Sequence, residues 1–161
     1  MMAKNDTKTQ GAEASAGATF QVVGQYARDV SLECPKAFFE EGADKIGVAL
    51  DVGVGAKTLD KDKGLHEVSL KLTGKATDEK KEARYLVEVD YAGVFKIEGV
   101  PEEHLAAVLS IDGASLIFPF ARQVFMDTVA ATGYRPGMIN PINFQALFLQ
   151  AQKQEGESKS A

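Results

Sequence analysis

Apolar and polar residues alternate along four successive segments of the chain, and this pattern constrains the fold more than any other feature. The first segment covers the fifteen residues 20–34 and ends at Pro35. The others cover residues 46–54, 67–73 and 84–91. A period of two is that of β-strands with one buried face. Short turns between the segments predict one antiparallel sheet with its other face in water.

After Gly99 the apolar residues recur with a helical period. Pro101, followed by two glutamates, predicts the start of a short helix, because Pro suits the first turn and acids suit the positive helix end. We expect Asp112-Gly113 to end this helix. A longer helix is predicted over residues 115–132, with Pro119 either in its first turn or at a kink.

Three further residues predict local features. Gly133 is expected to cap the end of the longer helix, and Asn143 is expected to cap a final helix. Gly93 is expected to mark a bulge in the fourth strand, because the alternation becomes less regular there. Strands first and helices later are typical of an α+β fold, here a four-stranded antiparallel sheet with helices packed on one face.

A single domain is expected over residues 20–151, between two disordered tails, residues 1–19 and residues 152–161, which lack a periodic apolar pattern. A chain of 161 residues that is 45% hydrophobic and 25% charged is ordinary for one globular domain. The longest mostly apolar run, residues 114–121, is shorter than the roughly 18–20 residues of a transmembrane helix.

The net charge of −5 belongs to the predicted domain, because the acids and bases within each tail cancel. An acidic domain without a basic patch argues against nucleic acid and anionic membranes as partners, and leaves room for a basic protein partner. Cys34 is the only cysteine, so no internal disulfide can form and a reducing compartment is indicated. The start of the chain lacks the apolar core of a signal peptide, and we expect a soluble cytoplasmic protein.

The common catalytic and ligand motifs are incomplete. Residues 53–58 (GVGAKT) superficially resemble a phosphate-binding loop, but two glycines of that motif are missing. His66 and His104 are the only histidines; neither has metal-ligand spacing, and both are expected to be solvated. Cys34 lies on the apolar side of its strand and is expected to be a buried thiol, and Ser115 lacks the motif of a nucleophilic serine. We therefore expect no enzyme activity, no cofactor and no metal site.

One apolar residue lies among acids on the polar side of the predicted sheet. Leu86 stands on the polar phase of the fourth strand, beside Glu88, while Asp29 and Glu33 stand on the polar phase of the first. Such a group could dock a basic partner with one apolar anchor. The alternative is that these acids only keep the sheet soluble.

Aromatic and apolar residues are also frequent in the loops and on the last helix. They are Phe38, Phe39, Tyr134, Met138, Ile139, Phe144, Leu147 and Phe148. They could line a groove for extended polypeptide. The alternative is that they cover the core.

Several segments resemble the SecB family of protein-export chaperones. In the helical half these are residues 117–122 (IFPFAR) and residues 140–148 (NPINFQALF), of which the second is the more specific. In the strands they are residues 26–35 (YARDVSLECP) and residues 88–95 (EVDYAGVF). The resemblance covers about residues 20–150.

The resemblance implies an ATP-independent cytoplasmic holdase that keeps secretory precursors unfolded and delivers them to the translocation ATPase SecA. It implies a homotetramer, a dimer of dimers, in which two subunits join their sheets into one of eight strands and helices lie between two such sheets. It implies no cofactor, because the zinc ion of the system is bound by the basic tail of SecA. It also implies no binding of nucleic acid and no insertion into the membrane.

The resemblance also implies site residues. In the family, the positions of Asp29, Glu33, Leu86 and Glu88 receive the SecA tail. The eight loop and helix residues above would line the groove for client polypeptides, and assembly would depend on Val87, Val89 and Tyr91. A different function remains open, namely a small α+β ligand-binding or enzymatic domain with Phe38, Tyr134 and Phe144 lining a pocket.

Overall fold

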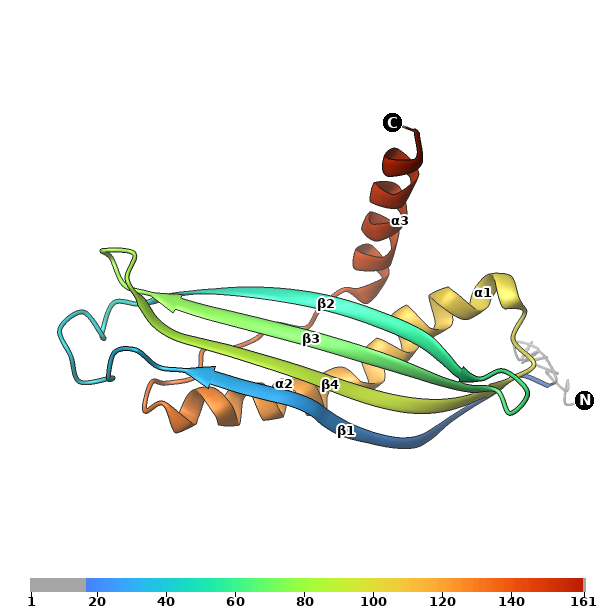
Figure 1. Cartoon of the computed structure of the whole chain (residues 1–161), viewed down its shortest axis with the longest axis horizontal. Helices are drawn as coiled ribbons and strands as arrows, with labels where there is room; N and C mark the ends of the chain where they lie inside the picture. Colours follow the sequence, from blue (N-terminus) through green and yellow to red (C-terminus); the bar gives the residue numbers. More distant parts are fainter. Residues whose placement is uncertain (1–16, 161) are drawn as a thin grey trace, which may run out of the picture.

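The computed structural model describes residues 17–160. Four long strands come first, β1 (Thr19–Glu33), β2 (Gly47–Asp60), β3 (Leu65–Thr77) and β4 (Ala83–Glu98). They form one antiparallel sheet in the order β1-β4-β3-β2, so β1 and β2 are its edges (Figure 1). The predicted four-stranded sheet is confirmed.

The helices that follow run on from one another: α1 (Glu102–Ala107), the π-helical turn η1 (Val108–Gly113) and α2 (Ala114–Ala131). The prediction that Asp112-Gly113 ends a short helix is therefore wrong. Gly113 is buried against β3, where a Cβ atom would lie 2.9 Å from Val68 Cγ2, so close packing explains this glycine. Pro119 lies inside α2 on an exposed side, where the carbonyl that it leaves unpaired can bind water.

One face of the sheet, called here the inner face, is covered by α2 (Figure 1). This helix packs mainly over β3 and β4 and contributes Ile117, Phe125 and Val129 to the core. Gly93 is not a bulge, because it pairs in regular register with both neighbouring strands. A Cβ atom at Gly93 would lie 2.7 Å from Ile117 Cγ2, so the glycine allows the close approach of α2.

The bulges lie on β1 instead. Val23 and Arg28 have no partner residue on β4, so each is an extra residue in the strand. Each bulge exchanges the inward and outward positions of the residues that follow. The alternation predicted for residues 20–34 is therefore interrupted twice. Odd-numbered residues face outward only before Val23 and after Arg28.

The final helix, α3 (Phe144–Ser160), begins as predicted: the Ala146 N–H donates to Asn143 Oδ1 at 2.9 Å. The predicted cap at Gly133 is also present, with a φ of 85°. However, α3 runs through residues 152–160, where a disordered tail was expected. Ala, Gln, Glu and Lys favour the helix, and a capped helix propagates easily. The helix projects away from the sheet (Figure 1). Residues 1–16 of the other predicted tail lie outside the described residues.

The helical stretch Glu102–Ala131 is long and apolar enough to cross a membrane, with a mean hydropathy of 1.5 over its best window. A core helix of a soluble protein meets the same criteria, so length and composition alone are weak grounds for a membrane span. Here one side of the stretch packs on the sheet.

Candidate functional site

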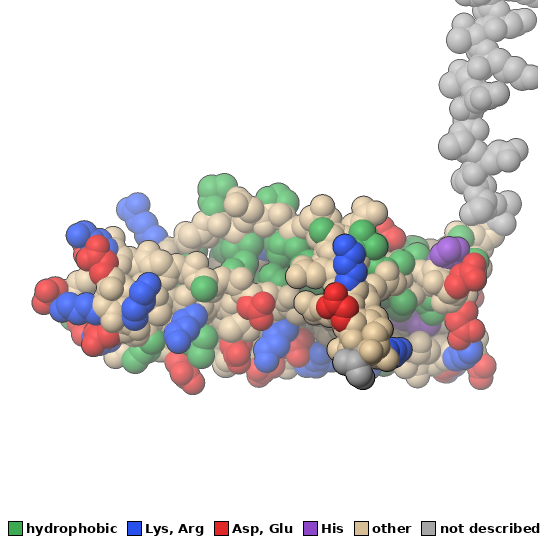
Figure 2. Space-filling model, turned by 90° about the horizontal axis from the view of Figure 1, so that it is seen from above, with side chains coloured by type: hydrophobic (Ala, Val, Ile, Leu, Met, Phe, Trp, Pro, Cys, Tyr) green, Lys and Arg blue, Asp and Glu red, His purple; other side chains and the backbone are tan. Residues whose placement is uncertain are grey.

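An apolar groove runs along the inner side of the β2 edge. Its sheet wall is formed mainly by alternate residues of β2, namely Val48, Leu50, Val52 and Val54, with Asp51 beside them at one end. One hollow of about 420 Å³ lies between this wall and residues 136–142, and another of about 410 Å³ continues toward α3. Both hollows include Val52, so they form one path. Viewed from the β2 side, hydrophobic side chains gather in this recess (Figure 2).

Five of the predicted groove residues line this path. Met138 is 91% exposed, and with Ile139 it belongs to the first hollow. Phe144, Leu147 and Phe148 belong to the second. These side chains come from the connection before α3 and from its first turns, as the sequence predicted.

Tyr134 and Phe144 are mostly buried and pack in the core of the chain, although Phe144 also reaches the lining of the second hollow. The Tyr134 hydroxyl group donates to the backbone carbonyls of Lys36 and Ala37, both at 3.0 Å. The ring of Phe144 packs on Phe118, with 5.6 Å between ring centres. Both residues are at most 5% exposed. Neither hollow of the groove has Phe38 or Tyr134 in its lining, so these hollows are not the pocket of the alternative function, which Phe38, Tyr134 and Phe144 would line together.

Phe38 and Phe39 lie in the loop between β1 and β2 and are 52% and 79% exposed. Their rings meet edge to face, with 5.4 Å between ring centres. Phe38 lies against Gly133, where a Cβ atom would come within 2.3 Å of the ring. The pair is thus near the chain segment that leads into residues 136–142, which form the wall of the groove opposite β2. Neither phenylalanine lines the two hollows.

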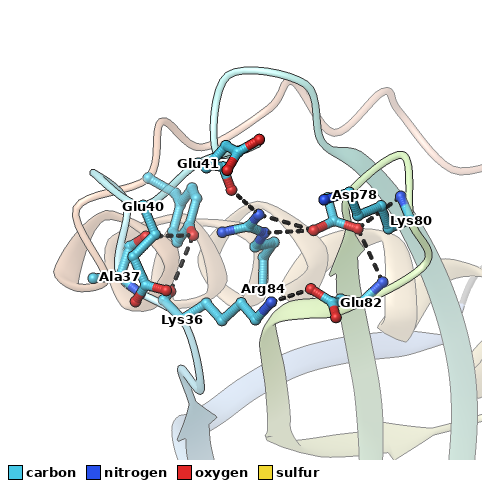
Figure 3. A network of polar contacts seen from close by, with 9 residues as sticks. Lys36, Ala37, Glu40, Glu41, Asp78, Lys80, Glu82 and Arg84 are labelled. Carbon is cyan, nitrogen blue, oxygen red and sulfur yellow. Dashed lines mark hydrogen bonds and ion pairs between the residues drawn. The ribbon is translucent and has the colours of Figure 1, made fainter.

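A buried ion pair ties this loop to the turn between β3 and β4. Arg84 Nε and Nη2 donate to Asp78 Oδ2 at 3.0 and 2.8 Å, and both side chains are almost completely buried. Arg84 also donates to the Glu41 carbonyl, and Lys36 pairs with Glu82 (Figure 3). Burial by itself raises the pKa of Asp78, but hydrogen bonds from the Glu82 backbone and from Arg84 hold it below its usual value. These contacts fix the loop that carries the two phenylalanines.

The acidic residues and Leu86 come together on the outer face of the sheet, away from α2. Glu33 lies directly opposite Leu86, and Ser31 lies opposite Glu88. Since paired residues share a face, Asp29, Glu33, Leu86 and Glu88 form one patch, called here the docking face. Leu86 and Glu88 are half-buried, while the two acids of β1 are exposed.

The charges of the docking face are largely free. Within residues 17–160, neither Asp29 nor Glu33 has an ion-pair partner within 4.0 Å. Glu88 is 4.0 Å from Lys71 Nζ, in an exposed pair that contributes little. The face therefore presents three acids around one apolar side chain.

A family model described as "Preprotein translocase subunit SecB" matches residues 13–155. This chain belongs to the SecB family. It is 40% identical over 155 residues to the protein-export protein SecB of Parvibaculum lavamentivorans, covering 94% of this chain and 89% of that one. It is 37% identical over 141 residues to that of Desulfotalea psychrophila, covering 86% and 89%.

The same fold occurs in a solved SecB-like chaperone of Mycobacterium tuberculosis, in complex with a peptide from an antitoxin. The TM-score is 0.66 at 12% identity, over 76% of this chain and 90% of that one. SecB chaperones are cytoplasmic, non-enzymatic proteins that hold precursor proteins for export through SecA. The predicted family, function and location are confirmed.

The single chain does not expose the residues on which assembly was predicted to depend. Val87 and Val89 are 0% exposed and Tyr91 is 8% exposed, all within the core of the single chain. A buried side chain has no surface for a second subunit, so a substitution there would act first on the core. These residues are core positions of the single chain, and the dependence of assembly on them stays a prediction.

Two burial predictions, those for His66 and Cys34, are wrong. His66 is buried, and its Nδ1 lies 3.1 Å from Thr58 Oγ1. Cys34 is exposed, because β1 is an edge strand that ends beside it. Within residues 17–160, no three His, Cys, Asp or Glu side chains are placed to hold a metal ion.

The β2 wall of the groove was not predicted, because Val48, Leu50 and Val52 have the alternation of ordinary core positions. A signal was available in the predicted elements. One helix about 10 Å across covers roughly two strands spaced about 4.8 Å apart. A four-stranded sheet under one long helix must therefore leave apolar residues of its edge strands uncovered.

Proposed function

We propose that the groove along β2 captures unfolded precursor polypeptide while the basic, zinc-bearing tail of SecA binds the docking face. The observation that carries this proposal is the separation of the two surfaces. The groove lies on the inner side at the β2 edge, and the docking face lies on the outer side over β1 and β4. A client in the groove thus leaves the docking face free.

Client capture follows from the chemistry of the groove. Unfolded chains present apolar side chains, which fit the recess, and unpaired backbone groups, which can pair with the free edge of β2. Weak contacts repeated along one path and over several subunits give tight binding that tolerates different sequences. No nucleotide is needed for such binding, and release follows when SecA takes over the client.

Docking follows from the charges of the outer face. A basic tail places its Lys and Arg side chains against Asp29, Glu33 and Glu88, and one apolar side chain against Leu86. Complementary charge speeds association and sets the register, while the apolar contact adds affinity.

We further propose assembly as a dimer of dimers. The β1 edge is fifteen residues long and carries exposed apolar residues such as Val30 (44%) and Leu32 (39%). Pairing of two such edges would join two sheets into one of eight strands and cover these residues. On α2, Leu116 (38%) and Phe120 (48%) are exposed and would pack between two such dimers.

The groove is tested by one substitution in each wall, Leu50→Ser and Met138→Ser together. We expect the affinity for an unfolded precursor, measured by titration calorimetry, to fall by about tenfold or more, because each lost apolar contact is worth about 1.5 kcal/mol or more when fully buried. Leu59→Ser is the control, since Leu59 is a similarly exposed residue of β2 outside both hollows. Equal affinity in both proteins would contradict the groove assignment.

The docking face is tested by the double reversal Asp29→Lys and Glu88→Lys. We expect loss of binding to the zinc-loaded C-terminal peptide of SecA, with folding and client capture unchanged, because exposed charges contribute little to stability. Wild-type binding should weaken with added salt. The double reversal Asp62→Lys and Glu98→Lys changes the net charge equally away from the face. If both proteins bind the peptide equally at low salt, the docking assignment is wrong.

A further inference from the structure

We propose that Arg28 is a positioning residue that holds the bulge of β1 and so turns Asp29 and Glu33 toward the docking face. Nothing in the established chaperone activity assigns a role to this arginine. The inference rests on the docking role proposed above, and it deepens that role by naming what sets the geometry of the acids.

Arg28 is held by carboxylates from two other strands. Its Nε and Nη2 donate to the two oxygens of Asp90 on β4 at 3.0 and 3.1 Å, and its Nη1 donates to Glu67 Oε1 on β3 at 2.8 Å. The Glu67 side chain is only 6% exposed and also accepts from the Tyr26 hydroxyl group at 2.7 Å. A planar guanidinium group that spans three strands in this way has one position.

The electrostatics strengthen this arrangement. The hydrogen bond to Asp90 raises the pKa of Arg28 further above its usual value. Burial alone would raise the pKa of Glu67, but hydrogen bonds from Tyr26 and Lys57 and the charges of Lys57 and Arg28 lower it overall. Glu67 is therefore a charged, nearly buried anchor that needs its cations.

The strand requires an extra residue at this point. Tyr26 faces outward before Arg28, and Asp29 faces outward directly after it. If Arg28 entered the pairing ladder, every later residue of β1 would shift by one place and change face. Asp29 and Glu33 would then face inward, and the apolar residues between them would face water.

If Arg28 acted only through its charge, its removal would strengthen binding of the basic tail, whereas the positioning role predicts weaker binding. Arg28 is a positive charge close to an acidic face that attracts a basic tail. Loss of this charge alone would make tail binding tighter, by up to about fivefold for an exposed pair. Loss of positioning would make binding weaker, because two of the three acids would leave the face.

The first measurement is the affinity of the intact chaperone for the zinc-loaded C-terminal peptide of SecA. We expect Arg28→Ala to weaken binding about tenfold or more, and Arg28→Lys to weaken it less. The control is Lys57→Ala, which removes another cation that contacts Glu67, at 3.0 Å, without touching the bulge. We expect equal or tighter binding for this control. Tighter binding of Arg28→Ala would overturn the proposal.

The second measurement observes the register itself, by methyl NOEs across β1 and β4. Val30 lies opposite Val89, and Leu32 lies opposite Val87, on the inner face. These contacts should weaken in Arg28→Ala and persist in Lys57→Ala; if they persist in both, Arg28 does not hold the bulge. If they weaken while peptide affinity stays unchanged, the positioning of β1 by Arg28 is supported, and the docking role of the face is what fails.

Discussion

At the scale of single residues, burial changes the pKa of a histidine in a way that the sequence alone does not reveal. His66 is one of two histidines and faces the inner side of β3, opposite Phe95. Burial lowers the pKa of His66 below its ordinary value of 6.5, because the charged ring would lose its hydration. The unfolded chain takes up this proton at a higher pH than the folded chain does.

We expect this difference to appear as acid sensitivity. As the pH falls below about 6.5, the unfolded chain binds the proton first, so the free energy of unfolding decreases until the lowered pKa of folded His66 is reached. Denaturant unfolding of wild type and His66→Gln, at fixed protein concentration, measures this effect. The pH dependence in this window should be smaller in His66→Gln, and an identical profile would contradict a buried, titrating His66.

Tyr134 tests whether an aromatic residue near the groove contacts clients or only holds the fold. Tyr134→Phe removes the hydroxyl group that bonds to the Lys36 and Ala37 carbonyls. We expect the free energy of unfolding to fall by about 0.5–1.5 kcal/mol, with little change in client affinity at a temperature where the protein is folded. A loss of client affinity at unchanged stability would return Tyr134 to the client surface.

At the scale of elements, close contact between α2 and the sheet depends on glycine. Gly93→Ala would place a Cβ atom 2.7 Å from Ile117 Cγ2, whereas Gly53→Ala on the edge strand meets only Lys71 Cβ, at 3.8 Å. We expect Gly93→Ala to lower the free energy of unfolding by about 1–3 kcal/mol, and Gly53→Ala to leave it unchanged or slightly raise it. Chemical denaturation measures both, and equal effects would mean that α2 is not held closely at this point.

At the scale of the whole molecule, the single chain leaves apolar surface on β1, on α2 and along β2. We assign the first two to assembly and the third to clients. Phe120→Asp should therefore lower the mass in solution from four chains to two, because a charge buried without a partner costs several kcal/mol. Light scattering checks this, with Gln123→Asp as an exposed control on the same helix. A monomeric wild type at micromolar concentration would contradict the proposed assembly.

The whole molecule also keeps the groove along β2 apart from the docking face. The groove is lined by residues of β2, of the connection 136–142 and of α3, and the docking face by residues of β1 and β4. These sets share no residue. A chaperone built in this way can present a client and receive its partner at the same time.

The sequence by itself determined the four strands, the starts of α1 and α3, the family and the members of the docking face. Periodicity, caps and family motifs are local, and each can be recognised within a few neighbouring residues. The grouping of Asp29, Glu33, Leu86 and Glu88 followed from the phase of two strands and from the family resemblance. It holds in the structure because the second bulge of β1 restores the phase that the first one changes.

Only the tertiary structure decided the strand order, the two bulges of β1, the unbroken helix through η1, and which apolar residues are core and which are surface. These features depend on contacts between residues far apart in the chain, such as Tyr134 with Lys36, or Arg28 with Asp90. A period of two says that one face of a strand is apolar. Whether that face is buried depends on the width of the one helix that covers the sheet, and this helix leaves the β2 edge open.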